Sequence, residues 1–485
     1  MTEDGEPTAR VAAARFLAAQ PELRAIENAM DVIRERRAAR RERLLVLDDD
    51  PTGTQSVHGV PVLTEWSSEV LAGALRDAST VFVLTNSRSM AEPDAVMVSR
   101  EIVERGAAIA TAEDYALAIA SRSDSTLRGH FPAEPDAVAQ ALEAAGHRID
   151  GVLLCPCFLE AGRITVDDVQ WVAERDELVP SGQTHYATDR SFGYTASDLR
   201  RWVEEKSDGA VPADSVLSVG LGDIRMGGPD RVREILAGAK GRAPVVVNAT
   251  EYSDLEVVVL GLLDAETAGQ RFVYRCGPSF VRVRGGIEPA PPLTAEALSR
   301  RRPSGGHGLV LVGSHVETTT RQLEAALALE QVHGRELSVE RLLEPEAREE
   351  ELAAALADVA RHLPDRDVIL YTSRELARAE GSDEALDVGR SISAALVELV
   401  QRLDPGLPLS FCVAKGGITS SDVGARGFGV RRAEVAGQML PGTISVWILP
   451  EDGPFPGLPY VIFPGNVGGD DTLAEVIERL RRKSG

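Results

Sequence analysis

The chain has 485 residues, more than one hydrophobic core usually spans, so we expect two or three domains. Hydrophobic residues make up 44% and charged residues 26%, values typical of a globular soluble protein. The formal net charge of -23 argues against nucleic acid as a partner, because phosphate backbones are bound by clustered Lys and Arg.

The cysteines and the hydropathy pattern restrict where the protein works. The four cysteines offer no disulfide framework, and Cys155-Pro156-Cys157 lacks the spacing and partner ligands of a zinc site. No stretch approaches the ~18 apolar residues of a transmembrane helix, and the acidic start at Thr2-Glu3-Asp4 does not resemble a signal peptide. We therefore expect a cytoplasmic protein with no membrane partner.

Residues 1–42 are predicted to form an N-terminal helical extension. Apolar residues recur at helical spacing over residues 8–42, which favours a pair of helices. The arginine-rich run over residues 34–43 is interpreted as a solvated helix face, since charge runs usually are.

From Leu44 onward, short aliphatic strands alternate with amphipathic helices, which is typical of a parallel sheet covered on both faces. This pattern predicts an α/β domain over residues 43–285. The expected strands are 44–47, 81–85, 115–120, 151–155, 216–219, 245–248 and 272–275.

The strand at 44–47 leads directly into Asp48, Asp49 and Asp50. In open α/β sheets ligands gather at the carboxyl ends of the strands. Three adjacent carboxylates repel one another, so a cation, a cationic side chain or a polyol with hydroxyl donors must compensate them. The sequence therefore predicts a ligand site at this turn.

Arginines follow the next strands at the same predicted edge: Arg88, Arg122, Arg128 and Arg163. Facing Asp48–Asp50 across a cleft, they would make a mixed lining suited to a small hydroxylated acid, with Arg for the carboxylate and Asp for the hydroxyls. Any single one of these arginines could instead serve only to neutralise the aspartates.

Residues 286–306 are rich in Pro and Gly and are predicted to be a linker. A second α/β domain is expected over 307–485, with strands at 308–312, 368–371, 409–414 and 460–463. Three of these strands end at a possible capping box, which starts at Ser314, Thr372 or Thr419. Three helix N-termini at one edge would favour an anion such as a polyphosphate.

Two glycine-containing loops strengthen that expectation. The first loop is Lys415-Gly416-Gly417-Ile418-Thr419. Its two glycines let the backbone approach a ligand closely, and its lysine supplies a point charge. The loop is neither a P-loop nor a dinucleotide fingerprint. The second loop, residues 464–471, contains Gly465 and Asn466 and is a further candidate for wrapping a nucleotide.

Taken in order, these motifs resemble the four-carbon acid sugar kinase family over roughly residues 44–485. Asp49-Asp50-Pro51-Thr52-Gly53 resembles its Asp-Asp-x-Thr-Gly turn, and residues 122–129 resemble its Lys-x-Asp-Ser-Thr-x-x-Gly stretch, with Arg122 in place of Lys. Residues 160–165 and 192–194 also match the family pattern. In the second half Gly313-Ser314, residues 416–419 and residues 463–466 resemble its nucleotide-binding loops.

The resemblance implies two doubly wound parallel-sheet domains with the active site in the cleft between them. It also implies an ATP-dependent kinase that phosphorylates a hydroxyl of threonate, erythronate, 3-oxo-tetronate or a related branched acid. ATP and Mg²⁺ are the expected cofactors, with no metal ligand assigned. A homodimer is compatible with the sequence, which does not fix the number of subunits.

The expected roles follow from that resemblance together with the chemistry of each residue. Arg88 and Arg128 would clamp the carboxylate while Asp49 and Asp50 hold the hydroxyls, and either Asp124 or Asp50 would be the general base. The remaining expected substrate contacts are Ser125, Gly162 and Arg163. The expected ATP contacts are Ser314, Lys415, Gly416, Gly417, Ile418, Thr419, Gly465 and Asn466.

Two alternatives remain open at this point. Asp48-Asp49-Asp50-Pro51-Thr52 also fits the Asp-x-Asp-x-Thr pattern of haloacid-dehalogenase-like phosphatases, with Asp48 as nucleophile and Asp50 as general acid. That interpretation assigns no function to the second half of the chain. A non-catalytic sensor of acid sugars is the other alternative, and assays for ADP release and phosphate release separate all three.

Overall fold

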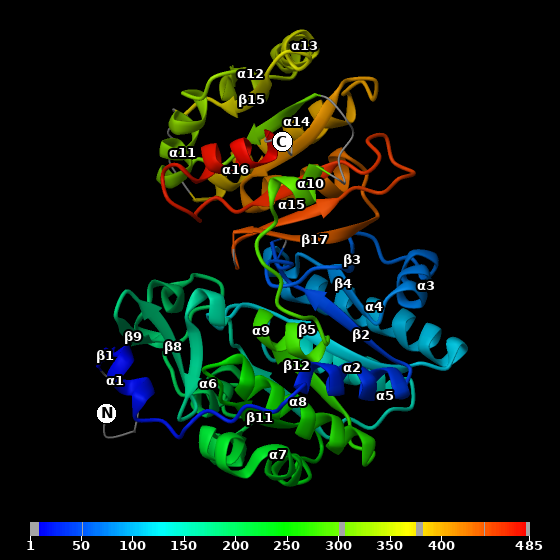
Figure 1. The fold of residues 1–485 in the computed structure, drawn as a ribbon, viewed down its shortest axis with the longest axis vertical. Helices are drawn as coiled ribbons and strands as arrows, with labels where there is room; N and C mark the ends of the chain where they lie inside the picture. The colour runs from blue at the N-terminus through cyan, green and yellow to red at the C-terminus, as the bar shows by residue number, and fades with distance from the viewer. Residues whose placement is uncertain (1–8, 51, 300–305, 375–381, 441, 482–485) are drawn as a thin grey trace. The chain divides into compact units, whose positions relative to one another are not determined.

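The computed structural model describes residues 9–50, 52–299, 306–374, 382–440 and 442–481. Contacts divide the chain into two compact units. Unit 1 comprises Met1–Gly53 and Glu65–Pro289, and unit 2 comprises Thr54–Thr64 and Ala290–Gly485. Both are α/β units, which confirms the predicted fold class (Figure 1).

Unit 1 is built on a fully parallel sheet with the strand order β10-β11-β6-β12-β5-β2-β4. Aliphatic side chains are buried along these strands because helices cover both faces. The strands are β2 (Glu42–Asp48), β4 (Thr80–Leu84), β5 (Ala116–Arg122), β6 (Gly151–Cys155), β10 (Leu217–Val219), β11 (Ala243–Val247) and β12 (Phe272–Cys276).

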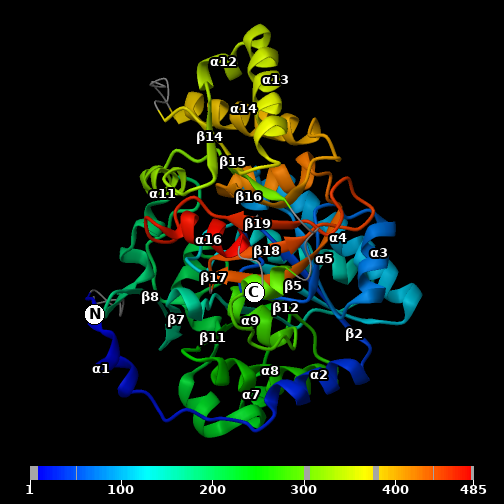
Figure 2. The same cartoon turned by 45° about the horizontal axis from the view of Figure 1, so that its top comes forward.

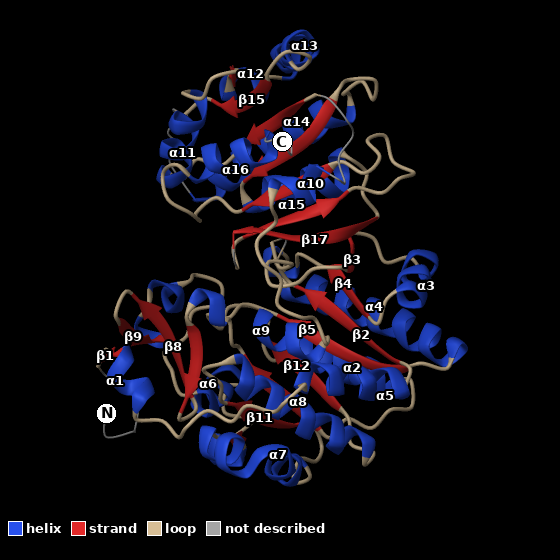
Figure 3. Cartoon of the chain, viewed as in Figure 1, coloured by secondary structure: helices blue, strands red, loops and turns tan. Residues whose placement is uncertain are grey.

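The helices of unit 1 form two packed groups, drawn in blue in Figure 3. One group is α3 (Ser68–Asp77), α4 (Glu92–Glu113) and α5 (Ala133–Ala144). The other is α2 (Ala29–Ala39), α7 (Gly228–Leu236), α8 (Tyr252–Thr267) and α9 (Pro278–Arg284). The described part of unit 1 also contains the helices α1 (Ala13–Ala18) and α6 (Leu199–Lys206).

A small antiparallel sheet, which the sequence analysis did not predict, belongs to unit 1. Its strand order is β1-β9-β8-β7, and the N-terminal strand β1 forms its edge. The strands are β1 (Val11–Ala12), β7 (Arg163–Val166), β8 (Val169–Glu174) and β9 (Glu177–Pro180).

Unit 2 contains a mixed sheet with the order β3-β17-β18-β19-β16-β13-β15-β14. The five strands from β19 to β14 run parallel, and β3, β17 and β18 pair antiparallel beside them. The strands are β3 (Val60–Leu63), β13 (His307–Val312), β14 (Val332–Leu337), β15 (Asp367–Thr372), β16 (Leu409–Lys415), β17 (Arg432–Leu440), β18 (Ile444–Ile448) and β19 (Pro459–Phe463).

The strand β3 comes from the N-terminal half of the chain. It pairs with β17 from Val60 opposite Val435 to Leu63 opposite Arg432, so the blue β3 lies beside the orange β17 in Figure 1. Thr54 in the same segment accepts a hydrogen bond from the Trp447 indole nitrogen at 3.1 Å. The chain therefore leaves unit 1 directly after Gly53, adds one strand to unit 2, and returns at Glu65.

Helices of unit 2 also pack in two groups, one with α10 (Ala295–Ser299), α11 (Glu317–Leu327) and α16 (Thr472–Arg481). The other contains α12 (Val339–Leu343), α13 (Pro345–His362), α14 (Ser382–Gln401) and α15 (Gly417–Asp422). Side chains from α11 and α16 bury against aliphatic and aromatic residues of the central strands, including Val310, Val413 and Phe463.

Every strand expected from the sequence is present, shifted by at most two residues at either end. The expected pair of N-terminal helices corresponds to α1 and α2. The arginine run at the end of α2, however, is not a solvated face. Arg37 is buried, and Arg36 and Arg40 pair with Asp264 and Glu266 of unit 1.

Arg37 belongs to an ion network that is sealed inside unit 1. Its Nε donates to the Glu42 carboxylate at 2.9 Å, and Arg284 donates to both Glu42 oxygens at 2.5 and 3.0 Å. Burial alone would raise the pKa of Glu42, but Arg284 and Arg37 outweigh it and lower the pKa to about 2. Without the Glu42 carboxylate, Arg37 and Arg284 would be buried charges that have lost an anionic partner.

We therefore expect Glu42→Gln to lower the free energy of unfolding by about 3–5 kcal/mol, the usual cost of breaking a buried ion pair. Urea unfolding followed by circular dichroism measures it. The matched control is Glu177→Gln, whose carboxylate pairs with Arg10 on the surface and should cost under ~1 kcal/mol. Equal losses of unfolding free energy in Glu42→Gln and Glu177→Gln would show that the buried network contributes no more than a surface ion pair.

The pH dependence of stability, compared between wild type and Glu42→Gln, gives a second measurement of the same ion network. Because the folded pKa of Glu42 lies below its unfolded value, its contribution is fully present above about pH 4.5 and is lost as the pH falls toward about 2. Wild type should thus lose more stability between about pH 5 and pH 3 than Glu42→Gln does.

Candidate functional site

The acidic turn and two arginine-containing loops meet at the carboxyl edge of the unit 1 sheet. In β2, Asp48 lies between Leu84 of β4 and Arg122 of β5 in the strand register, so the three loops that follow start side by side. The sequence predicted this meeting because loops after parallel strands converge on one edge of the sheet, and the structure places the side chains in direct contact.

Arg88 is held by two carboxylates. Its Nη2 and Nε donate to Asp49 at 2.5 and 3.2 Å, and its Nη1 donates to Asp50 at 3.0 Å. Although its own burial, the largest effect, lowers the pKa of Arg88, the two aspartates raise it well above its ordinary value. The guanidinium is therefore permanently charged and fixed in direction.

Asp48 lies beneath the turn and out of reach of a ligand. Its Oδ1 accepts from Arg122 Nη1 at 2.7 Å, while the buried Oδ2 has no hydrogen-bond partner among the described residues. A Cβ added to Gly53 would stand 1.8 Å from this Oδ2, so only glycine fits above it. Burial raises the pKa of Asp48 to about 7, against the lowering effect of Arg122.

Asp124 is paired on the other side of the cluster. Arg128 Nε donates to its Oδ2 at 2.7 Å, and the Thr126 hydroxyl donates to the same oxygen. Burial raises the pKa of Asp124, but Arg88 and Arg128 outweigh it and hold the pKa well below its usual range. Asp124 is thus an anion at neutral pH.

Arg275 is a site residue that the sequence analysis missed. It is buried in β12, and it donates to the backbone oxygen of Asp124 at 3.0 Å and to the Ser123 hydroxyl at 3.2 Å. Ser123 in turn donates to Asp49 at 2.6 Å. Arg275 therefore fixes the loop after β5, and no motif in the sequence marks it.

Glu134 was also missed because it sits in the first turn of a helix, where acidic residues are common. It is 6% exposed and lies beside Ser99. Burial, followed by the charge of Asp49, raises the pKa of Glu134 to about 7.

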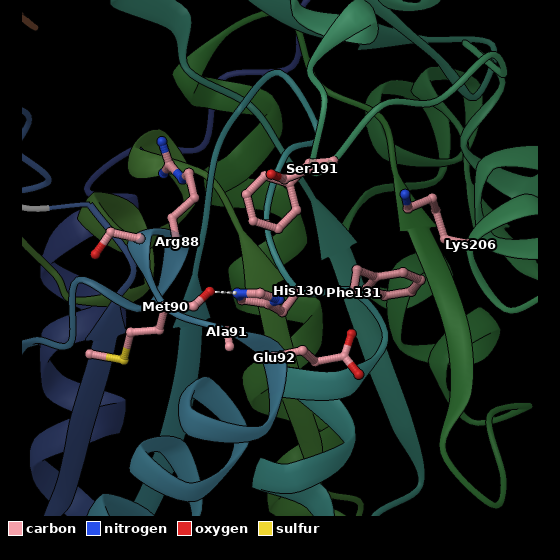
Figure 4. Close-up of a pocket in the computed structure, with 11 residues that line it drawn as sticks. Arg88, Met90, Ala91, Glu92, His130, Phe131, Ser191 and Lys206 are labelled. Atoms are coloured by element: carbon pink, nitrogen blue, oxygen red, sulfur yellow. Dashed lines mark hydrogen bonds between the residues drawn. The ribbon is translucent and has the colours of Figure 1, made fainter. Parts of the chain in front are cut away.

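A pocket of about 390 Å³ opens beside Arg88, as Figure 4 shows. His130 lies at its centre, with its Nε2 atom 3.2 Å from the backbone oxygen of Met90, and Lys206 stands at the far end. Phe131 and Phe192 give the wall an apolar part. The lining thus combines cationic, polar and aromatic groups next to the charged cluster.

The remaining expected substrate residues lie in different surroundings. Arg163 donates to the Tyr186 hydroxyl at 3.0 Å, and the same ring lies under Arg128. Ser125 is buried, and its backbone oxygen accepts from Gln170. Gly162 packs against Ala173 of β8.

In unit 2, four of the expected ATP residues come together at the carboxyl ends of β13, β16 and β19. A Cβ on Gly465 would stand 2.7 Å from Ser314 Oγ, and one on Gly416 would stand 3.2 Å from Thr419 Oγ1. Gly416 has a φ of +125°, a conformation that favours glycine. The loops therefore approach each other closely through glycine.

Gly417 differs from Gly416, because it faces open space and its φ is not left-handed. Ile418 follows it within α15, and Asn466 is exposed. Two of the three expected capping boxes are wrong: Val316 caps α11 and Gly416 caps α15, so neither Ser314 nor Thr419 is a cap. Glu375 of the third lies outside the described residues.

Lys415 does not project from the loop as a free point charge. Its side chain is fully buried, and its ammonium donates to the backbone oxygen of Pro464 at 3.0 Å and lies over the Phe463 ring. Burial lowers the pKa of Lys415 to about 7. The lysine thus ties the end of β16 to the loop after β19.

Both halves of the chain match known protein families. Residues 44–284 match the family described as "Sugar-binding N-terminal domain", and residues 309–473 match "Nucleotide-binding C-terminal domain". The chain belongs to the four-carbon acid sugar kinase family. It is therefore a kinase, with the acidic cluster in its sugar-binding domain and the glycine loops in its nucleotide-binding domain.

Two curated relatives resemble nearly the whole chain. A D-threonate kinase of Bordetella bronchiseptica is 28% identical over 460 residues, covering 90% of this chain and 97% of the relative. A D-threonate kinase of Salmonella typhimurium is 25% identical over 454 residues, with the same coverage. The crystal structure of Haemophilus influenzae protein HI1011 has the same fold, with a TM-score of 0.64 at 17% identity, covering 90% of this chain and all of that one.

The geometry agrees with kinase membership and disfavours the phosphatase alternative. A nucleophilic Asp48 would have to reach a phosphorus atom, yet Asp48 is 0% exposed and lies behind Gly53. Among the described helices, none combines the length and the hydrophobicity needed to cross a bilayer.

We expect Gly53→Ala to disrupt the acidic turn, because the added methyl group would overlap the Asp48 carboxylate. Overpacking of this kind costs about 1–3 kcal/mol. Because the same carboxylate accepts from the backbone N–H of Asp50, Asp50 should shift with it and kcat/KM should fall by at least tenfold. Thermal unfolding and a coupled ADP assay measure the two effects.

The control is Gly222→Ala, where the new Cβ meets only the flexible end of Met226 at 3.4 Å. That variant should keep its activity. A fully active Gly53→Ala would show that the turn tolerates a side chain, against the close packing described here.

Proposed function

We propose that the chain transfers the γ-phosphoryl group of ATP to a hydroxyl of a four-carbon acid sugar, with D-threonate the first candidate. The observation that carries the proposal is the cluster of four aspartates and four arginines in the sugar-binding domain. The names of the two curated relatives support the choice of acid.

The exposed members of the cluster are those that can meet a substrate. Arg88, Arg128 and Asp50 have side-chain exposures of 18%, 26% and 26%. We assign the substrate carboxylate to the free faces of the two arginines and the hydroxyls to Asp50. Asp49, only 2% exposed, would act by orienting Arg88 rather than by touching the acid.

The base remains a choice between Asp124 and Asp50, as the sequence left it. Both are anions, because nearby arginines lower their pKa against the effect of burial. Such weak bases suit phosphoryl transfer, where the hydroxyl proton leaves late and positioning supplies most of the catalysis. Asp124 is our first choice, since its carboxylate meets Arg128, one of the two arginines assigned to the substrate.

In the nucleotide-binding domain, Ser314, Gly416, Thr419 and Gly465 would contact the phosphates. Lys415 would act from below by holding the loop that carries Gly465. Magnesium, when bound, would neutralise the phosphate oxygens, which supply most of its ligands together with water in such sites. This chain's part is to present backbone and hydroxyl groups at fixed positions.

The proposal is tested by ADP release with ATP, Mg²⁺ and a panel of acids: both threonates, both erythronates, their 3-oxo forms and branched relatives. We expect turnover with at least one four-carbon acid and none with simple sugars. A folded protein that releases ADP with no acid of the panel would overturn the proposal.

We expect Asp124→Asn to lower kcat by about 10²–10⁴, because the amide cannot accept the proton, while nucleotide affinity stays unchanged. Asp189→Asn is the matched control: it also faces Arg128, at 3.8 Å, but is not a candidate base. Its kcat should fall less than tenfold. If Asp50→Asn proves far more damaging than Asp124→Asn, the role belongs to Asp50.

Gly417→Val is expected to weaken nucleotide binding at least tenfold without unfolding the protein. The new side chain would enter the open space beside the loop, where we place the phosphates, because a Cβ at this position meets no atom of another part of the protein within 4 Å. Calorimetric titration with a non-hydrolysable ATP analogue measures the affinity.

Gly389→Val serves as the control, because Gly389 in α14 also faces open space. It should bind the analogue like wild type. Undiminished binding by Gly417→Val would show that the phosphates do not pass this position.

A further inference from the structure

Three potential metal ligands converge in the nucleotide-binding domain, away from the glycine loops: His333, Asp358 and His362. His333 is the second residue of the edge strand β14, and the other two come from α13, which packs against that strand (Figure 2). One ligand atom from each lies within 4.8 Å of the others.

The backbone arrangement explains why the three side chains meet. Asp358 and His362 are four residues apart in α13, so they share one face of the helix, one turn apart. In the strand register His333 pairs with Val368, the second residue of β15. The cluster thus lies at the amino ends of the strands, opposite the edge that carries the glycine loops.

Two features of His333 point to a ligand. Its Nε2 atom is buried and has no hydrogen-bond partner in the described part of the chain, which is costly for a polar atom unless something binds it. Its ring stacks on that of His362 at a centroid distance of 3.8 Å and an interplanar angle of 27°. The two imidazoles are therefore adjacent and close to parallel.

The surroundings carry both signs of charge. Arg335 of β14 donates to Asp358 at 3.2 Å, and Arg366 follows α13. The Asp358 carboxylate is therefore oriented by Arg335 beside the two imidazoles.

We propose that His333, Asp358 and His362 bind one divalent transition-metal ion such as Zn²⁺, which fastens the end of α13 to the edge of the sheet. Two imidazoles and one carboxylate suit Zn²⁺, Co²⁺ or Ni²⁺, whereas Mg²⁺ prefers oxygen ligands alone. Tetrahedral zinc with bonds of about 2.0–2.1 Å needs ligand atoms about 3.3 Å apart, so modest side-chain rotations close the site around the ion. Water would complete the coordination.

The test uses the full, untagged chain after treatment with EDTA. Calorimetric titration with ZnCl₂ should give one site per chain, and Co²⁺ should develop the intense visible absorption of a four-coordinate site. An excess of Mg²⁺ should not compete. His333→Ala, His362→Ala and Asp358→Asn should each weaken Zn²⁺ binding at least tenfold and remove the rise in melting temperature that Zn²⁺ causes in wild type.

His147→Ala is the matched control, because His147 is a partly buried histidine outside this cluster. It should bind Zn²⁺ like wild type. Circular dichroism checks that each variant is folded, and Asp358→Asn is the mildest of them. The proposal is overturned if wild type binds no Zn²⁺ at 100-fold molar excess, or if folded cluster variants bind it as wild type does.

Discussion

Charge balance at the carboxyl edge of the first sheet is the constraint on which the sugar-binding domain depends. Asp48, Asp49 and Asp50 are adjacent in sequence, so their repulsion must be compensated within a few ångströms. Arg88, from the loop after β4, and Arg122, the last residue of β5, supply that compensation. The parallel strand order brings both arginines to the turn.

The compensation is graded with depth. Asp48 is sealed and has a raised pKa, Asp49 is buried between Arg88 and Ser123, and Asp50 reaches the surface as an anion. Only the outer layer can exchange its partners for a ligand. The deeper carboxylates thus act as a charged scaffold, which lets the exposed arginines keep one direction before any acid arrives.

The sequence predicted the parallel strands and the residues at their ends because aliphatic runs and polar turns are local signals. It did not predict Arg275, which hydrogen-bonds to Ser123 beside Asp49, or Glu134, whose pKa burial and the charge of Asp49 raise, because only the fold brings them near the cluster. It also missed β17, although Ala433, Val435, Gly437 and Met439 are buried in alternation there. A period-two pattern was present in β17, but Gly437 at a buried position and the apolar Ala436 beside it interrupt the alternation.

Lys415 shows a different limit of sequence reasoning. A lysine beside two glycines reads as a phosphate contact, yet its ammonium is satisfied by the backbone of the neighbouring loop. The direction in which the lysine side chain points cannot be read from such a motif, because the last residue of a buried strand can point to either face of the sheet. In the proposed function the same lysine would act on the nucleotide only through the loop that it holds.

The segment Thr54–Thr64 belongs to unit 2, although the chain on both sides of it belongs to unit 1. Unit 2, which contains the nucleotide-binding match, is not one continuous stretch of sequence, so a fragment beginning at Ala290 would lack β3. Its strand β17 would then expose a row of unpaired N–H and C=O groups, which invites pairing between copies. Exchange of whole domains between relatives must therefore carry the eleven-residue segment along, and with it the junction that directly follows the acidic turn.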